Sequence, residues 1–263
     1  MFAKLVHRLK ADLVPRNHSR TYKAALINAS ANGYSLVPSI DAYSMSDLNR
    51  VIALRHDVDL NDIKSNTSFF EIEREIGARA TYYFRLNTVR SHLPLIKKLI
   101  DHGFEVGYHF EEAADFGKSR NIKSTKILTT YRAEIQNRFK ANLKWFESIT
   151  NVKVASVCSH GDWYNRRLGF TNHVYIDEPL LSELGIQFEA YQDKFFNRFD
   201  TYVSDTGGAN SIWKNDVSLD AAIDLGKNSI YMLTHERTFF LDLKSTWESN
   251  RIVFGEQIKY KLS

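Results

Sequence analysis

The sequence predicts an α/β protein with a largely parallel sheet, built as one barrel-like domain. Short apolar runs rich in β-branched and aromatic residues alternate with longer stretches of helical period, which is the pattern of βα units. With 263 residues, of which 43% are hydrophobic, the chain is long enough for one α/β barrel or two modest domains. No linker rich in proline, glycine or serine divides the chain. We therefore expect a barrel domain at residues 46–263, with an N-terminal helical extension at residues 1–45 packed on it.

The expected elements follow one another regularly along the chain. A first helix near 22–31 leads into a loop at 36–45. The strands are expected at 51–57, 79–84, 104–109, 153–158, 186–189, 201–204 and 229–234. The helices between them are expected at 61–76, 92–101, 124–150, 178–184 and 219–225, and several of them end at a glycine. The charged segment 111–126 has two interpretations, a lid over a site or a solvated connection, and we expect the connection.

Composition excludes several classes of protein. The formal charge of +4 is mild and no dense Lys/Arg stripe occurs, so we expect no nucleic-acid partner. The single cysteine, Cys158, rules out an intramolecular disulfide and a Cys-rich metal motif. The first residues lack the features of a secretory signal, and no run of about 18 apolar residues occurs, so we expect a soluble, cytoplasmic protein. The basic, amphipathic start of the chain could lie on an anionic membrane surface, although we favour packing on the domain.

Four of the nine histidines stand at the ends of apolar runs that we expect to be strands. They are His56, His109, His160 and His235. Because the carboxyl ends of parallel strands meet at one face of a barrel or sheet, these side chains are expected to come together there. The other histidines fall in expected helices or loops, so the clustering is selective.

Two aspartates fit the same picture. Residues two apart on a strand face the same way, so Asp57 and Asp59 can both point toward His109 and His160. Imidazole and carboxylate together form a ligand set for zinc or a similar divalent ion, and three protein ligands leave a position open for water. Asp59 has a competing interpretation as the N-cap of the following helix.

Several of these segments carry a family resemblance. "ALRHDVD", "GFEVGYHFE", "VCSHGDW", "SDTGGANSIW" and "YMLTHE", within residues 51–236, resemble the successive motifs of NodB-homology polysaccharide deacetylases, carbohydrate esterase family four. The similarity is greatest to a divergent branch associated with O-antigen and other surface-polysaccharide genes. The resemblance implies a distorted (β/α)7 barrel and a divalent metal, which we expect to be zinc. It implies that Asp57 is the general base, that Asp59 and His109 bind metal, and that His235 is the general acid.

The sequence also departs from the family pattern. Where the second motif has another metal histidine, this chain has Ala113, and His160 is our candidate replacement. Val58 separates the two aspartates of the first motif, so the roles of Asp57 and Asp59 can be inverted, or His56 can enter the coordination shell. The third motif lacks its usual Arg-Pro pair.

Further residues are expected around this centre. Arg55 and Arg85 could hold a carboxylate or phosphate of the substrate, and Arg55 could equally form a structural ion pair. Trp163 and Tyr164 could stack on a sugar ring or plug the mouth of the barrel. Asp205 could orient a catalytic histidine by hydrogen bonding.

These expectations together predict a metal-dependent hydrolase of amide bonds that removes an acetyl or related acyl group from a sugar in surface-polysaccharide biosynthesis. The expected partner is an N-acylated sugar, a nucleotide-sugar or a polysaccharide precursor. One alternative is a catalytically inactive, deacetylase-like protein that binds carbohydrate or assists assembly, since Ala113 replaces a ligand. Another is a metal-dependent hydrolase of a non-sugar amide.

Overall fold

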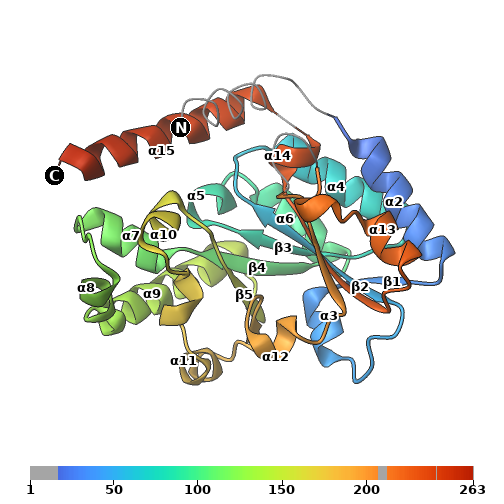
Figure 1. Cartoon of the computed structure of the whole chain (residues 1–263), viewed down its shortest axis with the longest axis horizontal. Coiled ribbons are helices and arrows are strands. Elements are labelled where there is room, and N and C mark those ends of the chain that lie inside the picture. Colours follow the sequence, from blue (N-terminus) through green and yellow to red (C-terminus); the bar gives the residue numbers. More distant parts are fainter. Residues whose placement is uncertain (1–16, 207–211, 241, 263) are drawn as a thin grey trace.

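The computed structural model describes residues 17–206, 212–240 and 242–262, and shows one curled parallel sheet with helices around it (Figure 1). The strands are β1 (Ser35–Pro38), β2 (Val51–Val58), β3 (Thr81–Phe84), β4 (Glu105–Phe110), β5 (Ser156–Ser159), β6 (Phe188–Glu189), β7 (Thr201–Ser204) and β8 (Ser229–Thr234). Seven of them follow the order β6-β5-β4-β3-β2-β8-β7, and every pairing is parallel. The expected distorted (β/α)7 barrel is confirmed.

The helices of the described residues connect these strands and cover the sheet. They are α2 (Ser19–Ala31), α3 (Ser39–Ser44), α4 (Ile63–Glu75), α5 (Leu86–Val89), α6 (Leu93–Asp101), α7 (Glu112–Ser119), α8 (Thr125–Thr129), α9 (Arg132–Thr150), α10 (Trp163–Leu168), α11 (Glu178–Glu183), α12 (Asp193–Phe196), α13 (Leu219–Asp224), α14 (Glu236–Phe239) and α15 (Leu243–Leu262). Among the described residues, no helix is both long and apolar enough to span a bilayer.

The N-terminal part of the chain contributes a strand that the sequence analysis missed. Residues 36–38, the start of the loop expected at 36–45, belong to β1, which pairs with the first half of β2, whereas β3 pairs with its second half. Four residues ending in a proline are too short to show a period. The expected helix near 22–31 is α2, whose Tyr22 and Leu26 are buried in the main core. The basic start of the chain lies outside the described residues, and the domain division at residue 45 stays a prediction.

Two expectations for residues 111–150 were wrong. The expected helix 124–150 is broken into α8 and α9, and the hydroxyls of Thr129 and Thr130 bond back to backbone carbonyls at the break. Such bonds compete with the helical ladder. The segment 111–126 is not a solvated connection, because it contains α7, which buries Ala113 and Phe116.

The alternation of side chains along β2 decides which polar groups enter the barrel. Ile52 and Leu54 belong to the core between sheet and helices, whereas Val51 and Ala53 belong to the cluster inside the barrel. By the two-residue period of a strand, Arg55 and Asp57 share the inner face and His56 the outer one.

The neighbouring strand β4 leaves room for a ring inside the barrel. A Cβ on Gly107 would lie 2.4 Å from the ring of Tyr83 and 2.9 Å from the carbonyl oxygen of Ser156. Only glycine allows that approach. Two residues on, His109 lies on the same inner face.

Candidate metal and active site

The predicted site residues lie at or just beyond the carboxyl ends of four strands. Asp57 is the next-to-last residue of β2, and Asp59 directly follows that strand. His109 lies near the end of β4, while His160 and His235 each follow the last residue of β5 and β8. The backbone N–H of His160 donates to the carbonyl of Phe110 at 2.8 Å, which ties the end of β5 to β4.

Three donor atoms for a metal converge at this rim. Asp59 Oδ1 is 3.5 Å from His109 Nε2 and 3.5 Å from His160 Nε2. One atom from each of these side chains lies within 4.8 Å of the other two. Tetrahedral coordination with bonds of about 2.0–2.1 Å separates ligands by roughly 3.3 Å, which is close to the observed spacing.

The hydrogen bonds of the two imidazoles leave their converging nitrogens as acceptors. His109 Nδ1 lies 3.0 Å from the carbonyl oxygen of Cys158, and His160 Nδ1 lies 2.9 Å from Glu111 Oε2. Since both partners accept, Nδ1 of each ring carries a proton, and Nε2 offers a lone pair to a cation when the ring is neutral. Burial lowers the pKa of His109 to about 4, although Asp57 and Asp59 act the other way, so this ring is neutral at neutral pH.

Asp59 supplies the test of whether a cation fits. Its Oδ1 is buried and has no hydrogen-bond partner among the described residues. Burial would raise the pKa of Asp59, but His160 and His109 outweigh it and hold the pKa below its ordinary value. This ionised oxygen lacks the hydrogen bond that a buried charge requires, and a divalent cation would supply a partner. The N-cap of α4 is Asp62, whose side chain accepts from the N–H of Ser65, so Asp59 does not cap that helix.

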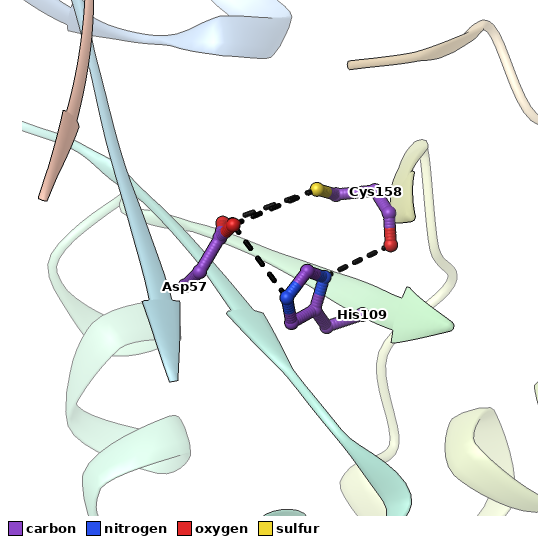
Figure 2. A group of neighbouring side chains, drawn as sticks. All are labelled: Asp57, His109 and Cys158. Carbon is purple, nitrogen blue, oxygen red and sulfur yellow. Dashed lines mark hydrogen bonds and ion pairs between the residues drawn. The ribbon is translucent and has the colours of Figure 1, made fainter. Parts of the chain in front are cut away.

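A second group of potential ligands lies deeper in the barrel. Figure 2 shows Asp57 facing both the ring of His109 and the thiol of Cys158. Cys158 Sγ is 3.9 Å from both carboxylate oxygens of Asp57, and burial raises the pKa of the thiol. A protonated thiol is a poor ligand. The cluster that contains Asp59 is therefore the better metal site.

Asp57 is held rigidly by a buried arginine. Arg55 Nε and Nη2 donate to the two carboxylate oxygens of Asp57, each at 2.7 Å. Arg55 also donates to the hydroxyls of Tyr191 and Tyr231. Burial would raise the pKa of Asp57, but the guanidinium outweighs it and holds the pKa well below its usual range. Because Arg55 is fully buried, its expected contact with substrate was wrong, and the alternative of a structural ion pair describes it.

His235 faces the two aspartates of the same centre. Its Nε2 is 4.0 Å from Asp57 Oδ2 and 4.0 Å from Asp59 Oδ2. Its Nδ1 lies 2.7 Å from Asp205 Oδ1, and its backbone N–H donates to Asp205 Oδ2 at 2.6 Å. Burial would lower the pKa of His235, but the charge of Asp205 and its hydrogen bond raise it to about 10. His235 is therefore protonated at neutral pH. Residues 207–211, from the motif that begins near Asp205, lie outside the described residues.

Glu111, which was not among the predicted site residues, supports His160. Glu111 Oε2 accepts from His160, and Oε1 accepts from Arg85 Nε at 3.0 Å and Nη2 at 2.5 Å. Glu111 lies two residues beyond His109 and one beyond the end of β4, and that spacing was the available signal. Arg85 thus fixes Glu111, and its contact with substrate stays a prediction.

Three other predicted residues lie away from the centre. His56 points to the outer face of β2, where Glu73 and Thr234 hold it, so its expected place around the ligands was wrong. Tyr164 is fully buried against Gly117, and Trp163 donates from Nε1 to Glu256 at 2.9 Å. The two aromatic side chains pack beneath α15, so neither offers an open face to a sugar ring.

Comparison with protein-family models found no match, and comparison with curated proteins found none. Solved structures similar to this chain include a CE4 family pseudoenzyme from Bacillus anthracis, with 14% identity, a TM-score of 0.44, and coverage of 78% of this chain and 60% of that one. A peptidoglycan deacetylase from Bacillus subtilis has 16% identity, a TM-score of 0.44, and coverage of 80% and 84%. A polysaccharide deacetylase from Bacillus cereus has 15% identity, a TM-score of 0.42, and coverage of 80% and 88%. The chain spans only 60–63% of the length of the pseudoenzyme chains.

Proposed function

We propose that this protein is a metal-dependent deacetylase that hydrolyses the N-acyl amide of a sugar. The observation that supports it best is the convergence of one potential ligand atom each from Asp59, His109 and His160, where the buried Asp59 Oδ1 has no hydrogen bond among the described residues. A divalent ion bound there polarises a carbonyl and makes water more acidic. We expect zinc, because imidazole and carboxylate suit it.

Asp57 and His235 would perform the two proton transfers of amide hydrolysis. Asp57 is ionised and oriented by Arg55, so it can take a proton from the attacking water. His235 is protonated, and its Nε2 faces the centre, so it can give a proton to the departing amine. Products would be the free carboxylic acid and the amino sugar.

The finer assignments follow from the motif resemblance. We propose an N-acylated sugar, nucleotide-sugar or polysaccharide precursor as substrate, a role in O-antigen or other surface-polysaccharide biosynthesis, and a cytoplasmic location. The presence of an acid, His235, and a base, Asp57, at one centre supports an amide bond as target, because hydrolysis of that bond needs both groups.

Elemental analysis of the purified protein, followed by an acetate-release assay, tests this proposal. We expect close to one equivalent of divalent metal in the wild type, none in His109→Ala, and an unchanged amount in His102→Ala, whose ring is exposed. Acetate release from a panel of N-acetylated nucleotide-sugars and oligosaccharides should disappear in Asp57→Asn. Metal-free wild type of normal fold would favour the inactive binding protein instead. Metal-loaded protein that releases acetate only from non-sugar amides would favour the other alternative.

A further inference from the structure

Helix α15 leaves an unusual amount of apolar surface uncovered. Of the twelve large hydrophobic side chains that are exposed in the described part of the chain, six lie on this one helix. Only Thr246 and Tyr260 of its residues are buried. Figure 1 shows α15 lying along one edge of the molecule. Exposed apolar surface concentrated in this way indicates an interaction site.

Five of these side chains share one face. Their spacing along the helix, at successive steps of four, seven, four and four residues, confines them to an arc of about 100°. The exposed fractions reach 67% for the Trp side chain and 65% for the Phe side chain. We call this set the outer face of α15: Leu243, Trp247, Phe254, Ile258 and Leu262.

Charge around the outer face is mainly positive. Lys244, Arg251 and Lys261 are exposed at or beside the stripe, against the single exposed carboxylate of Glu248. The other acidic residue of the helix, Glu256, points inward, where it accepts from Trp163 at 2.9 Å and from Lys118 at 3.2 Å.

The inward contacts also fix where the outer face lies in the molecule. Lys118 Nζ donates to Asp162 Oδ2 at 2.5 Å, and Asp162 is two residues from His160. Helix α15 is therefore anchored at the rim that carries the candidate site, with its apolar and basic side turned outward.

We propose that the outer face of α15 docks on an anionic lipid surface. Aromatic and aliphatic side chains interspersed with lysine and arginine suit the boundary between acyl chains and anionic headgroups, where a tryptophan ring is also favoured. A protein groove would have to match the apolar stripe in shape, whereas a fluid bilayer can adapt to the shape of the stripe. The three cations on this face complement anionic headgroups in particular.

Vesicle co-sedimentation of the full chain tests the proposal independently of catalysis. The wild type should bind vesicles that contain phosphatidylglycerol with phosphatidylcholine, bind phosphatidylcholine alone at least about tenfold more weakly, and dissociate as salt is raised. Trp247→Ser combined with Phe254→Ser should weaken binding to the anionic vesicles by at least about tenfold. Lys244→Glu combined with Arg251→Glu should do the same, with both variants retaining the circular dichroism spectrum of the wild type.

A matched control removes equally exposed apolar surface elsewhere. Leu225 lies just past α13, is 73% exposed, and should tolerate Leu225→Ser without loss of vesicle binding. Equal binding by the wild type and the Trp247/Phe254 double variant would overturn the proposal, as would no binding by the wild type. Loss of binding only on deletion of residues 1–16 would assign the membrane contact to that segment. A dimer of the wild type that the double variant dissociates, without any effect on vesicles, would make the outer face a contact between copies.

Discussion

Two buried polar clusters lie on opposite faces of β2, and both are built from imidazole and carboxylate. On the inner face, His109 Nε2 and His160 Nε2 each lie 3.5 Å from Asp59 Oδ1, which has no hydrogen bond among the described residues. On the outer face, His56 and Glu73 lie 2.6 Å apart in a network where every donor meets an acceptor. Similar residue types thus form an incomplete cluster on one face and a complete one on the other.

The outer network is complete in detail. Glu73 accepts from Tyr22 at 2.5 Å, from Tyr82 at 2.8 Å and from His56 at 2.6 Å, while Thr234 Oγ1 lies 2.7 Å from the other nitrogen of the His56 ring. Balanced buried networks of this kind stabilise the fold, whereas an unbalanced set of acceptors needs a ligand. The comparison teaches that the balance of donors and acceptors, and not residue type, separates the candidate site from the scaffold.

The strongest test of this contrast removes the centre of the outer network. Glu73→Ala leaves two tyrosine hydroxyls and the His56 ring without an acceptor, so we expect the free energy of unfolding to fall by about 3–5 kcal/mol. Urea unfolding should give the same loss with and without a chelator, because this cluster holds no metal. Tyr82→Phe removes only one of these hydrogen bonds and should lower the free energy of unfolding by about 1 kcal/mol. This milder variant keeps the test possible if Glu73→Ala does not fold. A loss that depended on the chelator would show that the two clusters are coupled.

Metal removal should affect only the inner cluster. At a metal concentration a thousandfold above the dissociation constant, a bound ion adds about 4 kcal/mol to the free energy of unfolding. A chelator should therefore lower the melting temperature of the wild type and of His102→Ala, but not that of His109→Ala. If neither a chelator nor added zinc changed the melting temperature of the wild type, the assignment of the inner cluster as a metal site would be contradicted.

Much of this contrast was visible in the sequence. Three of the four strand-end histidines, His109, His160 and His235, lie at the predicted rim with the two aspartates, because the parallel strands end together there. The direction of His56 was also available from the two-residue period of β2, since it alternates with Asp57. Arg55 shares the inner face of Asp57, yet its complete burial depends on Tyr191 and Tyr231, which are remote in sequence.

Other features required the assembled fold. The burial of Tyr164 depends on the absence of a side chain at Gly117. A Cβ at that position would lie only 2.2 Å from the hydroxyl oxygen of Tyr164. Residues 35–38 form a strand because they pair with the first half of β2. The backbone N–H of Arg79 also donates to the carbonyl oxygen of Leu36 at 3.2 Å. Neither contact has a local sequence signal.

Glu112 is intermediate between the two clusters, because only one of its two carboxylate oxygens accepts hydrogen bonds. Its Oε1 accepts from Tyr108 at 2.5 Å and from Asn142 at 3.0 Å, while Oε2 is buried without a partner among the described residues. Burial raises the pKa of Glu112 from 4.5 to about 7. The folded protein therefore holds a proton that the unfolded chain releases between these two pH values.

The sign of the pH effect follows from that proton. The contribution of protonated Glu112 to the free energy of unfolding is complete below pH 4.5 and is lost as the pH rises to about 7. At 1.36 kcal/mol per pH unit, the loss amounts to about 3 kcal/mol. Urea unfolding across this range should show the decline as a difference between the wild type and Glu112→Gln, which cannot ionise. Parallel profiles for the two proteins would mean that Glu112 is ionised in the fold.

The smallest expected effect concerns Glu111, which links the incomplete cluster to its surroundings. Glu111 accepts a hydrogen bond from His160 Nδ1 and is itself held by Arg85, so it keeps His160 Nε2 turned toward Asp59. Glu111→Gln keeps the shape but removes the charge, and we expect metal affinity to fall about 10–100-fold, equivalent to about 1.4–2.7 kcal/mol. Competition with a chromophoric chelator measures this affinity without any substrate. Glu112→Gln, one residue away and directed at Tyr108, is the matched control and should bind metal as the wild type does. If both variants kept full affinity, Asp59 and His109 would suffice to hold the ion, and the Arg85–Glu111 pair would belong with the scaffold on the outer face.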